Sequence, residues 1–344
     1  QAEDGIRDSV ASRGLGDVYK RQVLALSLVL VACTGSGTDE SSCREREDGD
    51  TLNVLATTPM MGEFVSQVGG DNISLTVLMP PEANPHTYDP SPQDATTIAE
   101  ADLIFFTGLK YEPAPLLKLL ESSACSPEVL AEVGESVFPV EFKEGGHDDH
   151  DDHGEEGHDD EEEGHDEHEG HGHGAYDPHF WFDPNRVSYA AEYIEGKLIQ
   201  YDPTNEESYK SLTDTFTTEL KGLVNEVIEL IGMIPSGNRK LITTHESLGY
   251  LEAKFGLEVL ATIIPSLDSS DEVSPSDLVE VIEVIEEEGV KVMFVESETP
   301  SVYAETLAQE TGITLVTGLY VETLKPNQSY SEFLISNVEL IVNS

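Results

Sequence analysis

The chain has 344 residues, of which 18 are basic and 68 acidic, and its formal net charge is -50. A surface of this charge repels nucleic acid and anionic lipid and attracts cations, which excludes nucleic acid as a partner. The length leaves room for two lobes of ordinary domain size. The tract Glu144–Gly174 contains 15 of the acidic residues and eight of the eleven histidines, but the remainder is strongly acidic without it.

The N-terminal segment predicts export. Residues 1–22 begin without Met and have no apolar period, so we interpret them as a non-native leader and exclude them from the fold. Residues 23–33 follow a Lys-Arg pair and form an apolar stretch too short to span a bilayer, as in the h-region of a signal peptide. This stretch ends in Leu-Val-Ala-Cys33, which resembles a bacterial lipobox and predicts a lipid anchor on Cys33. Residues 34–50 are expected to be a polar linker.

Residues 51–203 are expected to form an N-terminal α/β lobe, because short apolar strands alternate with helices, as in a parallel sheet. The expected strands are Leu52–Thr57, Ile73–Leu78, Leu103–Thr107 and Val137–Val140, and the expected helices are Met60–Val68, Ser91–Glu100, Pro113–Ser122 and Pro184–Ile199. The tract 144–174 interrupts this lobe and is expected to be disordered, since it has no apolar residue to bury. Cys43 and Cys125 could form a disulfide, and their spacing leaves this open.

The strongest helical pattern follows at residues 204–232, where apolar residues from Tyr209 to Leu230 recur at steps of three and four. Residues 233–344 then repeat the alternation and are expected to form a C-terminal lobe. Its expected strands are Lys240–Thr244, Leu257–Ile264, Val290–Val295 and Ile313–Val316, and its helices Glu246–Phe255, Ser276–Glu288, Ser301–Thr311 and Ser329–Val342. The predicted fold class is therefore α/β, with two parallel-sheet lobes joined by one long rigid helix.

The three histidines outside the tract are candidate metal ligands. His86 and His179 lie in predicted loops of the first lobe, and His245 directly follows a strand of the second. Ligands of open α/β sheets bind beyond the carboxyl ends of strands, so the three imidazoles can meet in the cleft between the lobes. A fourth ligand should follow another strand, and Glu322 is the predicted one. Glu246 and Glu296 are candidates to orient an imidazole, whereas Tyr88 and Trp181 are expected to pack.

Several segments in this order carry a resemblance to a known family. They are the Pro-His-Xaa-Tyr-Xaa-Pro loop 85–90, Ala101–Ile104, Gly108-Leu109, the Asp-Pro-His segment 177–184, the Thr-Xaa-His segment 243–257 and Phe294–Glu296. The chain resembles the zinc/manganese class (cluster A-I) of ABC-transporter solute-binding proteins, of the zinc-uptake lipoprotein type, over about residues 51–344. The resemblance implies metal capture outside the membrane and delivery to an ABC permease by a monomeric protein.

The same resemblance bears on the choice of metal. The family usually has Asp where this chain has Glu322, and its manganese branch has Glu where this chain has His245. Three imidazoles and one carboxylate suit Zn²⁺ best, with Mn²⁺ as the alternative within the family, and affinity alone leaves copper and nickel open. Three histidines could also hold the open zinc of a hydrolase or lyase, but no nucleophile or His-Glu-Xaa-Xaa-His motif is present, so no enzyme is expected. A surface adhesin or metal buffer is the other alternative.

Overall fold

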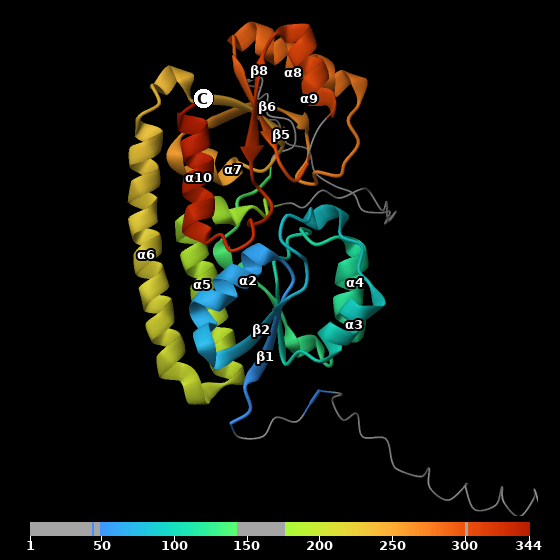
Figure 1. Cartoon of the computed structure of the whole chain (residues 1–344), viewed down its shortest axis with the longest axis vertical. Helices are drawn as coiled ribbons and strands as arrows, with labels where there is room; N and C mark the ends of the chain where they lie inside the picture. Colours follow the sequence, from blue (N-terminus) through green and yellow to red (C-terminus); the bar gives the residue numbers. More distant parts are fainter. Residues whose placement is uncertain (1–42, 45–48, 143–175, 300–301) are drawn as a thin grey trace, which may run out of the picture. The chain divides into compact units, whose positions relative to one another are not determined.

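The first sheet has four parallel strands in the order β2-β1-β3-β4 (Figure 1). A computed structural model describes residues 43–44, 49–142, 176–299 and 302–344 of the chain. The strands are β1 (Leu52–Ala56), β2 (Ile73–Val77), β3 (Leu103–Phe106) and β4 (Leu130–Glu132). The first three of these were predicted. The predicted leader and signal (1–33), the start of the linker and the tract 144–174 lie outside the described residues.

Helices cover both faces of this sheet, because its central strands β1 and β3 are buried on both sides. Alternate strand residues belong to different clusters: Val54 and Leu103 pack with one core, whereas Leu55 and Ile104 pack with another. The helices are α2 (Pro59–Gly69), α3 (Pro92–Ala99), α4 (Ala114–Ser123) and α5 (Pro184–Tyr201), with α2 and α5 on one face and α3 and α4 on the other (Figure 1).

The strand predicted at residues 137–140 is wrong. The fourth strand comes earlier, at β4, and residues 134–137 form a 3-10 turn instead. Gly134 fits closely against the sheet, where an added Cβ would lie 2.6 Å from the Thr107 carbonyl oxygen. Phe138 follows with φ 53°, which no strand residue adopts. The apolar run 137–140 therefore lies after the last strand of the sheet, and its first residue, Val137, packs in the core.

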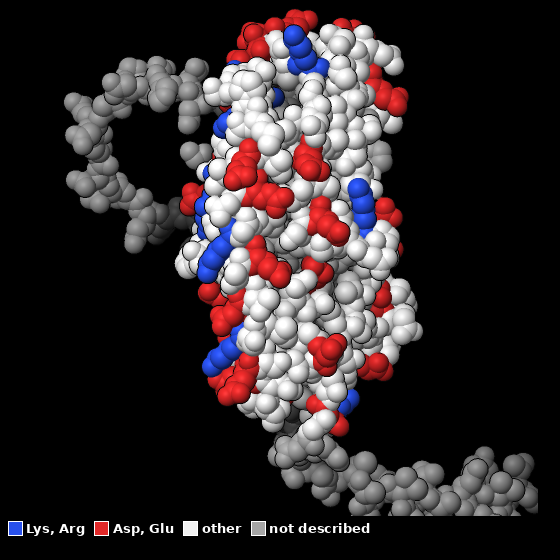
Figure 2. Space-filling view, turned by 60° about the vertical axis from the view of Figure 1, so that its left-hand side comes forward, with Lys and Arg blue, Asp and Glu red and all other residues white. Residues whose placement is uncertain are grey.

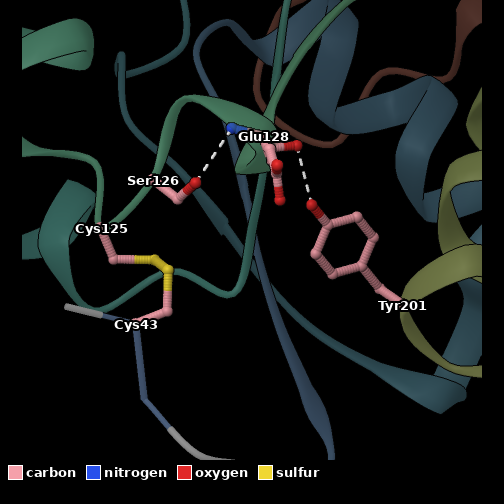
Figure 3. The surroundings of a disulfide bond; sticks show 5 residues. All are labelled: Cys43, Cys125, Ser126, Glu128 and Tyr201. Carbon is pink, nitrogen blue, oxygen red and sulfur yellow. Dashed lines mark hydrogen bonds between the residues drawn. A yellow bond between two sulfur atoms is a disulfide. The ribbon is translucent and has the colours of Figure 1, made fainter. Parts of the chain in front are cut away.

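A disulfide joins Cys43 to Cys125, which the spacing had left open (Figure 3). Cys125 lies just after α4, at the start of a turn that Ser126 caps by accepting a hydrogen bond from the Glu128 backbone N–H. The hydroxyl of Tyr201, the last residue of α5, donates to the Glu128 carbonyl. The bond therefore ties the segment before β1 to a part of the lobe that other contacts already fix.

Replacing Cys43 and Cys125 together with serine is expected to lower the free energy of unfolding by about 2–4 kcal/mol. The physical reason is that the bond closes a loop with a sequence separation of 82 residues, which restricts the unfolded chain. Urea denaturation of the double variant measures the loss. A reductant should lower the stability of the parent protein similarly and leave the variant unchanged. An unaltered urea midpoint in the variant would contradict this expectation.

The long helix predicted at 204–232 is α6 (Glu206–Gly232), 27 residues or about 40 Å of helix. Its buried stripe contains most of the predicted positions, with Tyr209, Phe216 and Val227 among them. In Figure 1 it runs alongside α5 and the final helix α10 (Tyr330–Val342) and reaches from the first sheet toward the second. A capping box of Ser329 and Glu332 begins α10.

The second lobe contains two parallel strand pairs. Strand β5 (Lys240–His245) pairs with β6 (Glu258–Ile264), and β7 (Val292–Glu296) pairs with β8 (Thr314–Leu319). A backbone N–H of β7 donates to a threonine hydroxyl of β5, so the two pairs lie side by side. The helices of this lobe are α7 (Gly249–Phe255), α8 (Pro275–Glu288) and α9 (Val302–Thr311).

The predicted fold class is confirmed, since both lobes contain parallel sheets and a long helix accompanies them. The largest apolar cluster includes residues of both lobes and of α6 and α10. Within the described residues, no helix has the length and apolarity to cross a membrane. Figure 2 shows Asp and Glu scattered over one face, with fewer Lys and Arg between them, as the global acidity predicted.

Candidate metal centre

His86 lies in the loop between β2 and α3, on a short 3-10 turn (Pro85–Thr87). The Asn84 side chain caps this turn, because its Oδ1 accepts the His86 backbone N–H at 2.9 Å. The imidazole packs edge-on against the Tyr111 ring, with centroids 5.1 Å apart. The turn therefore presents His86 from the carboxyl-terminal end of the first sheet.

His179 is held by the aspartate two residues before it. Asp177 Oδ1 accepts both the His179 backbone N–H, at 2.8 Å, and its Nδ1, at 2.7 Å. Because Nδ1 donates to this carboxylate, the lone pair of a neutral ring is on Nε2. The Asp-Pro-His spacing thus fixes both the tautomer and the direction of the ring.

His245 is the last residue of β5, and Glu296 is the last residue of the neighbouring strand β7. Glu296 accepts His245 Nδ1 at 2.6 Å and its backbone N–H at 3.1 Å. Both residues are almost fully buried. Two strands that end at the same edge therefore create a second imidazole–carboxylate pair. This pair again leaves the lone pair of Nε2 available to bind a metal ion.

Glu322 follows β8 by three residues, and its backbone is fixed from two sides. Glu298 Oε1 accepts the backbone N–H groups of residues 321, 322 and 323 at 3.2 to 3.3 Å. The Tyr111 hydroxyl donates to the Glu322 carbonyl at 2.9 Å. The Glu322 side chain is completely buried.

The four predicted ligand residues converge. One ligand atom from each of His86, His179, His245 and Glu322 can be chosen so that all lie within 4.8 Å of one another. Glu322 Oε1 is 3.2 Å from His86 Nε2 and 2.8 Å from His245 Nε2, and its Oε2 is 3.4 Å from His179 Nε2. Neighbouring ligand atoms around a tetrahedral zinc ion are about 3.3 Å apart.

Three of these atoms have no hydrogen-bond partner although they are buried, namely Nε2 of His179 and of His245 and Oε2 of Glu322. His245 Nε2 and Glu322 Oε1 are therefore close to each other, but their angles do not meet the geometry of a hydrogen bond. Buried polar atoms are rarely left without a partner. Donor atoms of this kind that face one another can be satisfied by a divalent cation.

The charges of the clustered side chains strongly shift the pKa values of His179, His245 and Glu322. Burial lowers the pKa of His179, but the negative charges of Glu322 and Asp177 outweigh it and raise that pKa to about 9. Burial likewise lowers the pKa of His245, and Glu296 and Glu322 raise it well above its usual value. Burial raises the pKa of Glu322, yet the three histidines bring it well below the usual range. These shifts favour the protonated forms of His179 and His245 and the ionised form of Glu322.

Comparison with known proteins identifies the family. Residues 54–344 match the family model described as "Zinc-uptake complex component A periplasmic". The chain belongs to this family. It is therefore a substrate-binding protein of a metal ABC transporter, in a family of solute-binding proteins and not of enzymes.

The chain is similar to relatives whose names mention different metals. It is 29% identical to the high-affinity zinc uptake system protein ZnuA of Bacillus subtilis, over 94% of this chain and 96% of the relative. It is 26% identical to the manganese-transporter lipoprotein PsaA of Streptococcus anginosus, over 93% and 96%. It is 24% identical to the iron-transporter lipoprotein MtsA of Streptococcus pyogenes, over 91% and 93%. Family membership therefore shows a metal-binding protein and leaves the metal open.

Among solved structures, the periplasmic zinc-binding protein TroA from Treponema pallidum superposes with a TM-score of 0.71. The match is 20% identical and covers 86% of this chain and 99% of the other. At this identity the likeness concerns the fold, and it agrees with the two-lobe arrangement described above.

Sequence reasoning missed several residues around this candidate metal centre. Asp177 was not predicted to orient His179, although its position two residues earlier in Asp-Pro-His is a usable signal. Tyr111 and Glu298 were also missed, because only the tertiary structure brings them to Glu322.

Of the two predicted orienting carboxylates, Glu296 contacts His245, whereas Glu246 accepts a hydrogen bond from Thr262 instead. Trp181 is buried in the core as predicted, and its Nε1 donates to the Val321 carbonyl. Tyr88, also predicted to pack, is partly buried and donates to Asp94. Trp181 and Tyr88 therefore combine apolar packing with one hydrogen bond each.

Proposed function

We propose that this protein captures Zn²⁺ outside the cytoplasm and delivers it to an ABC permease, with His86, His179, His245 and Glu322 as the ligands. The observation that carries the proposal is the convergence of four buried donor residues, three of which have ligand atoms without a hydrogen-bond partner. Two of the imidazoles are oriented by buried carboxylates, an arrangement that is general for zinc-binding histidines.

The donor set favours zinc over manganese. Mn²⁺ prefers oxygen ligands and has the lowest affinity of the divalent first-row series for a site rich in nitrogen, whereas Zn²⁺ prefers a tetrahedron of imidazole and carboxylate. Four protein ligands complete this tetrahedron. A closed set of ligands suits an ion that is carried, while catalytic zinc needs an open position for water. This supports transport over the hydrolase alternative.

Two further parts of the proposal, the lipid anchor and the acidic tract, concern residues outside the described ranges. The two streptococcal relatives are named as lipoproteins, which supports a lipid anchor at Cys33. We further propose that tract 144–174 concentrates zinc near the site, since eight histidines and 15 carboxylates offer many weak ligands. The proposed division is a first lobe at 51–203, a linking helix at 204–232 and a second lobe at 233–344, in a monomeric protein.

Competitive zinc titration of the chain with and without residues 144–174 tests this function. We expect one tight zinc per chain in both proteins, and additional weak binding only in the protein with the tract, because a flexible chain must be ordered at each weak site. Manganese and iron(II) should compete poorly for the tight site. Loss of the tight event on deletion would place the principal site in the tract. Tighter binding of manganese than of zinc would overturn the metal assignment.

The tight site is expected to bind zinc with release of protons at pH 7, because zinc needs neutral imidazole and the pKa of His179 is raised to about 9. Apparent zinc affinity should therefore rise as the pH increases toward 9. The stability of the metal-free fold should change in the opposite direction. Because the pKa of His179 in the folded protein lies above its usual value of 6.5, protonated His179 stabilises the fold fully below about pH 6.5. This stabilisation is lost as the pH rises through 9. Calorimetry in buffers of different ionisation enthalpy measures the protons, and zinc binding with no proton release at pH 7 would contradict the expectation.

A further inference from the structure

The three histidines of the site are not held equally. His179 and His245 each donate Nδ1 to a buried carboxylate, at 2.7 and 2.6 Å. Nδ1 of His86 comes no closer than 3.9 Å to its acidic neighbour Asp268, whose side chain is 46% exposed. His86 therefore lies on the side of the site nearest to solvent, and its Nδ1, unlike that of the other two histidines, has no carboxylate within hydrogen-bond distance among the described residues. Its position depends on the turn that carries it.

Asn84 connects this turn to the second lobe. Its Nδ2 donates to Ser269 Oγ at 2.9 Å and lies 3.3 Å from Thr299 Oγ1, to which it also donates. Ser269 belongs to the loop between β6 and α8, and Thr299 to the segment between β7 and α9. One amide group has two N–H donors, so both bonds can form at once.

The orientation of the Asn84 amide follows from the backbone. The His86 N–H can only donate, so the atom that faces it at 2.9 Å must be Oδ1. This places Nδ2 toward the two hydroxyls. The same side chain thus caps the turn of His86 and spans the lobes.

A second contact from the same loop reaches the segment that carries Glu322. The Tyr320 hydroxyl donates to Glu82 Oε1 at 3.3 Å. Residues 82–84 therefore contact three segments of the second lobe. An ion held by His86 on one side and by His245 and Glu322 on the other would therefore lie next to the place where these hydrogen bonds join the two lobes.

We propose that Asn84, with Ser269 and Thr299, is an interlobe latch that slows the release of the bound metal. Asn84 acts as a positioning residue, because it touches His86 through the backbone and contacts no ligand atom. The proposal rests on the proposed function of the four-residue site. It predicts an effect on the dissociation rate, since the latch must break for the ion to leave, while the association rate should change little.

The test is the rate of zinc release to a chelator, measured by stopped flow in the chain that lacks residues 144–174. The variant Ser269→Ala/Thr299→Val removes both acceptors and leaves the bond between Asn84 and His86 intact. Two lost hydrogen bonds predict release about tenfold faster, with association within about twofold of the parent. Thr306→Val is the matched control, because its exposed hydroxyl bonds only within its own helix.

Asn84→Ala completes a double-mutant cycle. We expect it to accelerate release in the parent by more than in the Ser269→Ala/Thr299→Val background, because the latch is already absent there. Release at the parent rate in Ser269→Ala/Thr299→Val, or effects that simply multiply in the cycle, would overturn the latch while the zinc site remains. If the parent and a His245→Ala variant release zinc at the same rate, the proposed site itself fails, and the latch with it.

Discussion

Replacing His245 with alanine is expected to weaken zinc binding at the tight site by on the order of a hundredfold or more. Loss of a residue that only orients a zinc ligand already costs about 10- to 100-fold in affinity, and His245 is proposed as a ligand. Its Nε2 is buried without a hydrogen-bond partner and faces Glu322. Competition with a chromophoric chelator at pH 7.5 measures the change, and His179→Ala should behave alike.

Two further variants separate ligation from folding. Loss of His245 leaves the almost fully buried Glu296 without its imidazole, which also destabilises the protein. Glu296→Gln keeps the imidazole and should weaken zinc binding by about 10- to 100-fold while the protein stays folded. His158→Ala, the same substitution within the tract, is the matched control and should leave the tight event unaltered. Parent-like affinity in both His179→Ala and His245→Ala would remove the proposed site.

Replacing Glu322 with glutamine is expected to cost a similar factor, on the order of a hundredfold, because it removes the only charged ligand but preserves the side-chain size. The substitution should also lower the pKa of His179. Burial lowers that pKa in any case, and the Glu322 charge is the first of the causes that raise it to about 9. Protons then compete less with zinc in the variant.

The loss of affinity in Glu322→Gln should consequently be larger above pH 9 than at pH 7, since proton competition at the lower pH weakens zinc binding more in the parent than in the variant. Competition titrations at the two pH values, with imidazole pKa values from NMR, measure both effects. Glu305→Gln, an exposed carboxylate of α9, is the control. Equal losses at both pH values would show that Glu322 does not control the protonation of His179, and an unaltered affinity would exclude it as a ligand.

Much of the fold could be predicted because the local signals agree with the tertiary environment. β1 and β3 are apolar on both faces, as strands covered by helices on both sides must be. The stripe of α6 was readable because a helix that packs on one side repeats its apolar residues every three to four positions. The strand predicted at 137–140 failed for the opposite reason: of its apolar residues only Val137 is buried, and Phe138 is exposed. The left-handed φ at Phe138 and the close fit of Gly134, which rule out a strand here, are visible only in the tertiary structure.

The sequence by itself determined which residues are candidate ligands, since isolated histidines that follow strands or lie in loops between elements can be recognised without coordinates. It also placed Glu322 beyond a strand of the second lobe. Only the tertiary structure decided which polar groups hold them. Asp177 and Glu296 orient two rings, Glu298 fixes the Glu322 backbone, and Asn84 spans the lobes. Except for Asp177, these contacts join residues distant in the chain, so their geometry depends on how the lobes pack and leaves no local pattern.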